Sequence, residues 1–268
     1  MIGLAEPSHD LIETLPSGDV NWTSNVLTAE GTHVPGPASS RSAGVLQARQ
    51  NAATNLLLTL QRIRMDAYRT AADIMHADDR VNAKIVEMIQ AVPVAQEANG
   101  PGGRVDVTVE MPLLGGLAQL MLPDEIKQVR SIRQVGDTAI KEELTLEAAA
   151  GSEPEMPYTG LVVDARGIGI KPAMAPAIVD ENGKQVYGSA FVSREFAVQY
   201  GVCRYTRDPE ARLRKTRIAP HPLSVKGLRT LPGRDCDIMI SNADAAKLRD
   251  ASDNIGFLKQ CRVMIIVD

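Results

Sequence analysis

Two short polar stretches carry side chains that could hold a ligand. Asp164 and Arg166 follow an apolar run, and at alternate positions of a strand both side chains would project from the same face. Ser241 and Asn242 stand where an apolar run gives way to a helical pattern, a junction whose backbone N–H groups can bind an anion. These four are the candidate ligand-binding residues. In both cases a structural role is favoured, as an ion pair for the first two and as a helix cap for the others.

The sequence Gly167-Ile168-Gly169 after an apolar strand invites comparison with a dinucleotide-binding loop. The third glycine of that pattern would fall at Pro172, where a proline removes a backbone donor and prevents close packing of the helix. We therefore interpret this stretch as a turn that ends a strand, and we expect no nucleotide cofactor.

No pattern in the sequence indicates a catalytic or metal site. Paired carboxylates at a defined spacing, a nucleophile elbow, a phosphate loop and an H-E-x-x-H motif are all absent from the sequence. Cys203, Cys236 and Cys261 form no C-x-x-C pair, and the four histidines lie far from them in the sequence. We expect no enzyme, no catalytic residue, no metal and no cofactor. Free thiols are favoured over a disulfide between Cys236 and Cys261.

Composition narrows the classes of partner. The 268 residues are 44% hydrophobic but only 3% aromatic, so the core must consist of aliphatic side chains, and stacking platforms for nucleic acid are not expected. The net charge of −4 also opposes nucleic-acid binding. The basic residues Arg212, Arg214, Lys215 and Arg217 could attract an acidic partner or lipid head groups, although a solvated surface is favoured. No apolar run is long enough for a transmembrane segment.

Residues 1–19 are polar and rich in turn-forming residues, so we expect a disordered leader there. An N-terminal domain over 20–135 follows. Its predicted elements are a strand over 20–30, a helix over 41–64, a weaker helix after Asp79, and a hairpin of strands 92–98 and 104–111. The apolar patch 113–122 is expected to pack back on this domain, and the acidic stretch 136–156 is expected to be a linker.

The C-terminal domain is expected over 157–268. Its predicted strands are 158–166, 177–180, 184–188, 223–228, 236–240 and 261–267. A helix capped by Ser241 or Asn242 runs to Asp250, and a crossover through it would make the last two strands parallel neighbours. The fold class is therefore α+β, with two small domains, each a mixed or antiparallel sheet with one or two helices packed on it.

Two segments resemble a known family. The first segment comprises Tyr158 to Gly167, Pro172, Ala173, Pro176 and Val186 to Gly188. The second comprises Ile240 to Ala246 and Phe257 to Val263. They are similar to the C-terminal half of bacterial envelope proteins related to outer-membrane lipoproteins of the flagellar basal-disk type and to flagellar assembly protein T. The first half is similar more loosely, in its order of strand, Ala-rich helix and late hairpin.

The resemblance implies a non-catalytic structural or assembly role in the periplasm or at the outer membrane, with peripheral membrane association and with other envelope proteins as partners. The sequence around Met1 shows neither a signal peptide nor a lipid-attachment cysteine. The alternative is a periplasmic module that uses 164–172 to bind a cell-wall fragment or a small anion. We also expect a homo-oligomer, because the apolar strand 261–267 needs cover on both faces.

Overall fold

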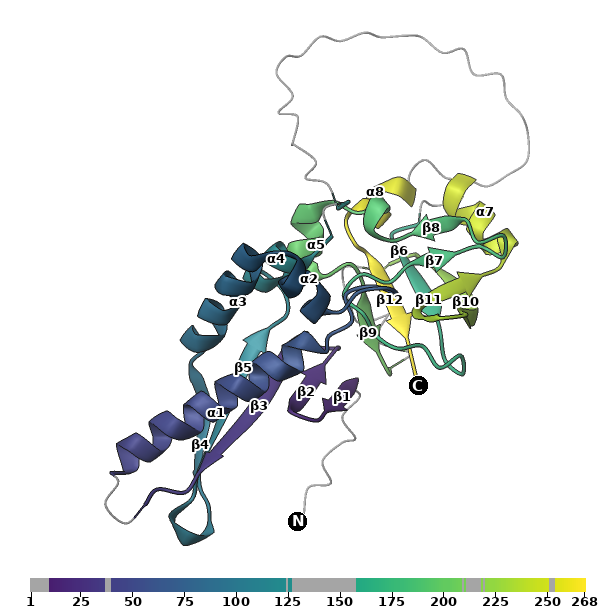
Figure 1. Cartoon of the computed structure of the whole chain (residues 1–268). Helices are drawn as coiled ribbons and strands as arrows, with labels where there is room; N and C mark the ends of the chain where they lie inside the picture. Colours follow the sequence, from purple (N-terminus) through teal and green to yellow (C-terminus); the bar gives the residue numbers. More distant parts are fainter. Residues whose placement is uncertain are drawn as a thin grey trace, which may run out of the picture.

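The computed structural model describes residues 10–36, 40–123, 125–126, 158–208, 210, 218, 220–250 and 254–268. They form two β-sheets with helices packed on them (Figure 1). This confirms the predicted α+β class. The predicted linker over 136–156 lies outside the described residues, as do residues 1–9 of the predicted leader.

The first sheet is antiparallel, with its five strands in the order β1-β2-β3-β5-β4. The strands are β1 (Ile12–Leu15), β2 (Gly18–Asn21), β3 (Val26–His33), β4 (Val94–Asn99) and β5 (Val105–Pro112). The hairpin of β1 and β2 corrects the expectation of disorder up to residue 19. The strand predicted over 20–30 is also interrupted, because Asn25 takes a left-handed φ of 59° at a turn.

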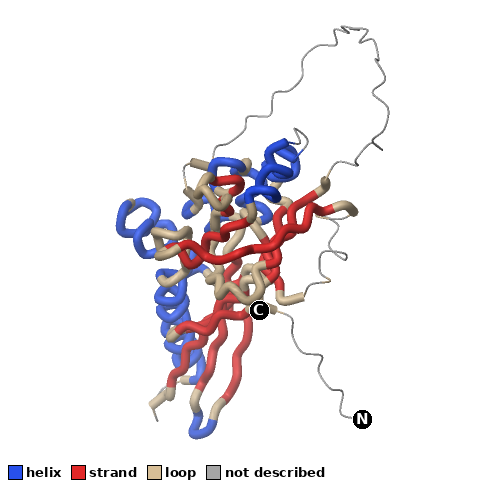
Figure 2. Tube along the Cα trace, turned by 90° about the vertical axis from the view of Figure 1, so that its right-hand side faces the viewer, coloured by secondary structure: helices blue, strands red, loops and turns tan. Residues whose placement is uncertain are grey.

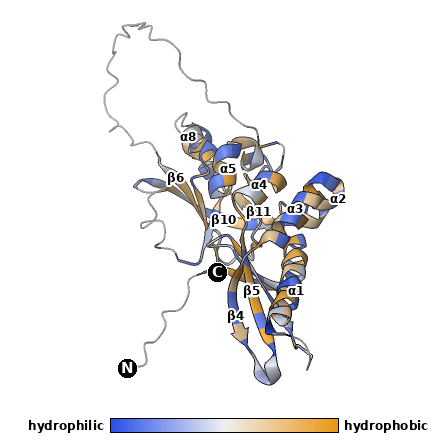
Figure 3. Ribbon diagram, turned by 90° about the vertical axis from the view of Figure 1, so that its left-hand side faces the viewer, coloured by the Kyte–Doolittle hydropathy of each residue, from blue (hydrophilic) through white to orange (hydrophobic). Residues whose placement is uncertain are grey.

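Helix α1 (Arg41–Gln61) covers one face of this sheet (Figure 2). Ser40 caps it by accepting a hydrogen bond from the backbone N–H of Ala43, and its buried stripe includes Ala48, Ala52 and Leu56, as the periodicity predicts. On β5 the residues alternate between buried apolar and more exposed polar side chains, a pattern visible in Figure 3. The sheet therefore has one covered face and one open face.

Three further helices belong to this half. They are α2 (Ala71–Ala77), α3 (Asp79–Ala91) and α4 (Gly116–Met121). Thr70 and Asp73 form a capping box on α2, and Asp78 caps α3. Helix α4 contains the apolar residues Leu117, Ala118 and Met121, which are buried in the main core as expected for the patch 113–122.

The second sheet is mixed, with seven strands in the order β8-β7-β11-β10-β6-β12-β9. They are β6 (Gly160–Asp164), β7 (Ile178–Val179), β8 (Gln185–Tyr187), β9 (Arg204–Thr206), β10 (Pro222–Leu231), β11 (Arg234–Ile240) and β12 (Val263–Ile266). Its helices are α5 (Arg194–Tyr200), α7 (Asn242–Asp250) and α8 (Asn254–Lys259). The prediction that β11 and β12 are parallel neighbours is wrong, because β12 pairs with β6 and β9, and β11 pairs with β10 and β7.

The two sheets share one apolar core. A single cluster of buried residues contains Trp22 and Leu56 from the first half together with Val263 and Ile265 from the second. The rings of Trp22 and Tyr205 meet edge to face, with centroids 5.9 Å apart. The other face of β12 packs against Val162 and Ile218. Both faces of β12 are thus covered within the chain, so its apolar sequence gives no reason to require a second copy.

Polar contacts also join the halves. The backbone N–H groups of Met174 and Ala175 donate to the carbonyls of Arg64 and Met65, at 2.9 and 2.8 Å. The Arg64 guanidinium donates to the Pro172 carbonyl at 2.8 Å and to both oxygens of Glu13 at 2.6 Å. The Glu13 carboxylate also accepts from Nε1 of Trp22 at 2.8 Å. We call these contacts of Arg64, Glu13 and Trp22 the Arg64 clamp.

Candidate functional site

The Asp164–Arg166 pair lies where β6 ends. Arg166 donates from Nε to Oδ1 at 2.8 Å and from Nη2 to Oδ2 at 2.7 Å, and its backbone N–H also reaches Oδ1 at 3.2 Å. The two side chains form the bidentate pair that their alternate spacing predicts. The Asp164 carboxylate is about one quarter exposed and the guanidinium nearly half exposed.

This geometry determines the protonation of Asp164. The hydrogen bonds from the Arg166 side chain lower the pKa of Asp164 from its ordinary 3.8 to about 2, against the opposing effect of partial burial. The nearby charge of Lys226 contributes a smaller lowering of the same pKa. Asp164 is therefore ionised at neutral pH with both oxygens engaged, which makes it a poor proton acceptor for catalysis.

A hollow of about 430 Å³ opens beside this pair on the outer face of the second sheet. The strand register places Thr206, Ile266, Asp164 and Lys226 in one row across four strands, and Arg204, Met264, Val162 and Ser224 in the next. The lining residues are Val162, Asp164, Arg166, Glu210, Ser224, Val225, Lys226 and Ile266. Lys226 is exposed and has no ion-pair partner among the described residues. The hollow thus combines the apolar side chains of Val162 and Ile266 with the Lys226 ammonium, the Glu210 carboxylate and the Asp164–Arg166 pair.

The glycines next to the pair form a turn at the end of β6. Gly167 and Gly169 both have positive φ values, 78° and 66°, which is the conformation that a turn after a strand requires. The Gly167 N–H already donates to the side-chain carboxylate of Asp268, at 2.9 Å to Oδ2. The interpretation of this stretch as a turn is confirmed.

Ser241 and Asn242 act at the start of α7. The Ser241 hydroxyl accepts from the backbone N–H of Asp244 at 3.0 Å and donates to its carboxylate at 2.9 Å. The backbone N–H of Asn242 donates to Glu181 at 2.8 Å. Ser241 therefore caps the helix, one of the two caps that the sequence favoured, whereas Asn242 is the first residue of α7 and its backbone N–H is satisfied by Glu181. No described hydrogen bond or ion pair connects them to Asp164 or Arg166, so the four candidates do not form one site.

Two other hollows were not predicted from the sequence. One of about 290 Å³ lies between the halves, and its lining includes Arg64, Tyr68, Lys171, Asp235 and Cys236. The charges are paired there too, since Lys171 contacts Asp235 at 2.8 Å. Tyr68, which lies between α1 and α2, is 75% exposed, and the Arg234 guanidinium carbon is 5.6 Å from the centre of its ring. No sequence pattern marks this hollow, because its walls are distant in the sequence.

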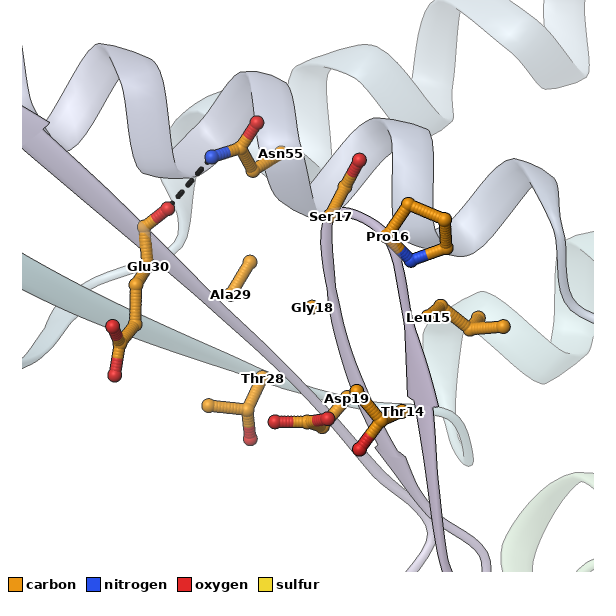
Figure 4. A pocket seen from close by; sticks show the side chains of 10 residues that line it. All are labelled: Thr14, Leu15, Pro16, Ser17, Gly18, Asp19, Thr28, Ala29, Glu30 and Asn55. Atoms are coloured by element: carbon orange, nitrogen blue, oxygen red, sulfur yellow. Dashed lines mark hydrogen bonds between the residues drawn. The ribbon is translucent and has the colours of Figure 1, made fainter.

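The second unpredicted hollow, of about 280 Å³, lies at the β1–β2 turn (Figure 4). Its lining is Thr14, Leu15, Pro16, Ser17, Gly18, Asp19, Thr28, Ala29, Glu30 and Asn55. The Asn55 amide donates to the Glu30 carbonyl at 2.7 Å and ties α1 to β3. The side chains of Thr14, Asp19, Thr28 and Glu30 point to the side of the sheet away from Asn55.

The thiols offer no reactive centre. All three cysteines are buried, and none of them forms a disulfide. Burial raises the pKa of the Cys203 and Cys236 thiols to about 12, so neither forms a thiolate at neutral pH. The described residues contain no group of three or more His, Cys, Asp or Glu side chains arranged to hold a metal ion. Nor is any helix in this part of the chain both long and apolar enough to cross a membrane.

Residues 160–268 match the family model described as Treponema pallidum Tp0624, second domain. The match begins at the first residue of β6 and ends at the last residue of the chain, so it includes the whole second sheet and all four candidate residues. No curated protein matches the chain. The similarity to the Treponema domain concerns the second half alone.

Proposed function

We propose that this chain is a non-catalytic cell-envelope structural or assembly protein that acts by binding other proteins. A role in flagellar assembly and a place in the periplasm or at the outer membrane are the finer parts of this proposal. They are based on the resemblance of Tyr158 to Gly167 and Ile240 to Ala246 to envelope proteins. The pairing of Asp164 with Arg166 and the burial of the thiols support a role without catalysis.

The observation that carries the proposal is the outer edge of β4. This strand is the last in its sheet, and five of its six residues are exposed. Its outer backbone N–H and C=O groups can pair with a strand of another protein, which is a common mode of recognition. The partly exposed Arg41–Glu97 ion pair, at 3.8 Å, is the one charged contact described on this strand. The edge therefore has little of the charge that normally blocks strand addition.

Cross-linking and fractionation in the native bacterium would test this function. Ala95→Lys with Ala98→Lys places two charges on the β4 edge, whereas the control Ala83→Lys changes an exposed residue of α3. We expect the wild type and the control in the envelope fraction, cross-linked to defined proteins, and we expect the edge variant to lose those products. A protein confined to the cytoplasm, or cross-links that the edge variant retains, would contradict the proposal.

A second candidate function is a binding module for a cell-wall fragment or a small anion. The unpaired Lys226 in the 430 Å³ hollow, beside the apolar side chains of Val162 and Ile266, favours it. Titration with soluble sugar-peptide fragments, followed by amide NMR shifts, would test it. Binding should move the signals of 162–166 and 224–226 and should weaken at least tenfold in Lys226→Gln. Unchanged spectra at millimolar ligand would eliminate this candidate.

A further inference from the structure

The open face of the first sheet carries a regular array of hydroxyl and carboxylate groups. Directly paired residues of antiparallel strands share a face, and the register pairs Thr28 with Glu110, Glu30 with Thr108 and Asp19 with Thr28. These side chains alternate with the buried residues that pack under α1, so they lie on the face opposite the helix. Figure 4 shows Asp19, Thr28 and Glu30 extending from that face.

This face carries unneutralised negative charge. Asp19, Glu30 and Glu110 have no ion-pair partner among the described residues, and Glu30 and Glu110 are exposed. Asp106, farther along β5, is already neutralised by Arg104 at 2.9 Å. We call Asp19, Glu30 and Glu110, with the threonines between them, the acidic face.

The outer face of the second sheet has the opposite character. Its register places Arg204 and Lys226 on the same side as Met264 and Ile266, and neither cation has an ion-pair partner among the described residues. The negative charge of Asp164 on this side is neutralised by Arg166. In the sequence, no acidic residue occurs between Glu210 and Asp235. Between the two cations, the side chains of Met264 and Ile266 are buried in a cluster with Ile218, and the exposed Glu210 lines the same hollow as Lys226. We call the two cations, Arg204 and Lys226, the basic face.

From these two surfaces we propose that copies of this chain associate head to tail, the acidic face of one copy against the basic face of the next. The partner is a second copy of this chain because the two complementary surfaces occur on one polypeptide and use different residues. Each copy has both surfaces, so the contact is heterologous and can repeat. This inference rests on the proposed function, since it names one partner for a protein that acts by association.

The contact should depend on salt and concentration. Charges on exposed faces attract at low ionic strength and are screened when the Debye length falls to a few ångströms. The average mass by sedimentation should therefore rise above 28.8 kDa as the protein is concentrated from about 10 to about 300 μM in ~20 mM salt. At ~500 mM salt it should return to the monomer value.

Charge reversal gives the decisive test. Glu30→Lys with Glu110→Lys reverses the acidic face, and Arg204→Glu with Lys226→Glu reverses the basic face. Each double variant should be monomeric alone. An equimolar mixture should associate with rising concentration as the wild type does, because the retained basic face of one variant fits the retained acidic face of the other, and the two reversed faces also carry opposite charges. A chain that carries all four changes should again show an average mass that rises with protein concentration.

Controls separate this contact from loss of structure. Lys84→Glu with Glu87→Lys exchanges two exposed charges on α3 and should leave the mass curve unchanged. Circular dichroism and urea midpoints should match across all variants. A wild type that stays monomeric at low salt, or one whose association survives reversal of either face, would overturn the inference. Binding of the basic face to anionic lipid vesicles without self-association would also overturn it.

The outcomes also separate this inference from the proposed function. A monomer that still cross-links to envelope proteins through β4 refutes head-to-tail contact and leaves the proposed function intact. A cytoplasmic protein that self-associates as described refutes the proposed envelope function and leaves the contact between copies intact.

Discussion

Glu13 illustrates how one side chain can join two distant segments. Its carboxylate accepts from Arg64 and from Trp22, and Arg64 in turn donates to the Pro172 carbonyl of the second half. Arg64 and Glu13 are each about one quarter exposed, so water only partly compensates for the loss of either. The Arg64 clamp is therefore one of the polar contacts that join the two halves.

Replacing Glu13→Gln should destabilise the protein. The amide keeps the shape of the side chain but removes the charge that holds the guanidinium, at a cost of about 1–2 kcal/mol. The free energy of unfolding in urea measures it. Glu87→Gln, on the exposed side of α3, is the matched control and should change nothing. Equal stabilities of the two variants would show that the clamp contributes no net stability.

The Asp164–Arg166 pair makes stability depend on pH. The pKa of Asp164 is about 2 in the folded protein, below its ordinary 3.8, so the folded state favours the ionised form. The resulting stabilisation is complete above about pH 5 and is lost as the pH falls from about 4 through 2. Allowing for solvent screening at a partly exposed pair, it amounts to about 1 kcal/mol.

Comparison with Asp164→Asn measures this effect. The wild type should be the more stable of the two at pH 6, and the difference should fall as the pH is lowered from about 4 and disappear below about pH 2. Titration of the carboxyl carbon by NMR should give a midpoint near 2 in the wild type. A midpoint near 3.8 would contradict the pairing.

The cysteines should be inert in the folded protein. Because Cys203 and Cys236 are buried with a pKa near 12, and Cys261 is also buried, a disulfide-exchange reagent at pH 8 should find no fast-reacting thiol. In denaturant all three thiols should react rapidly with the reagent. A stoichiometric fast reaction in the native state would disprove the burial of that thiol.

Candidate residues could be predicted from the sequence where their partners are local. Arg166 lies two residues from Asp164, and Ser241 three from Asp244, so spacing alone predicts the ion pair and the cap. Arg64 and Glu13 are 51 residues apart in the sequence, and no spacing rule connects them. Lys226 joins Asp164 only through the pairing of β6 with β10, a register that the sequence leaves undetermined.

At the scale of elements, the packing of α1 on β3 depends on a glycine. A Cβ built at Gly31 would lie 2.1 Å from the backbone nitrogen of Ala52 and 2.2 Å from the carbonyl oxygen of Ala48. These are backbone atoms of α1, so the helix itself would have to move away from the strand. Gly31 therefore sets how closely helix and sheet approach.

Gly31→Ala should destabilise the protein by about 3 kcal/mol, measured by urea unfolding. Gly256→Ala is the matched comparison, because a Cβ there meets no atom within 4 Å and the residue lies inside α8. That change should stabilise the protein by about 0.5–1 kcal/mol through helix propensity. Changes of the same sign in both variants would contradict the close approach at Gly31.

The elements that the sequence predicts well are those defined by local periodicity. Helix α1 and the β4–β5 hairpin appear close to their expected bounds, because their patterns repeat within one element. Strand β1 was missed since four residues show too little alternation, and its order depends on distant contacts such as Trp22 N–H to Leu11. The pairing of β12 was misjudged because strand order is decided by tertiary packing.

For the whole molecule, the shared core predicts that the halves stay together without a covalent connection. Cleavage within 136–156, where the sequence predicts a linker, should leave both fragments in one particle of unchanged mass on gel filtration. The packing of Trp22 on Tyr205 and the Arg64 clamp hold them. Trp22→Ala should weaken this association after cleavage. Fragments of the wild type that separate under native conditions would contradict the prediction and support two independent units.

The Arg64 clamp and the shared core also fix the angle between the two sheets. A molecule whose two contact surfaces keep one relative orientation repeats the same rotation and the same translation at every step of a head-to-tail chain. Such a series defines a single screw axis, so the polymer would have one pitch and one handedness. Removing the Glu13 carboxylate from the Arg64 clamp would let the angle between the sheets vary. The pitch would then differ from one polymer to the next, although each contact between copies would keep its strength.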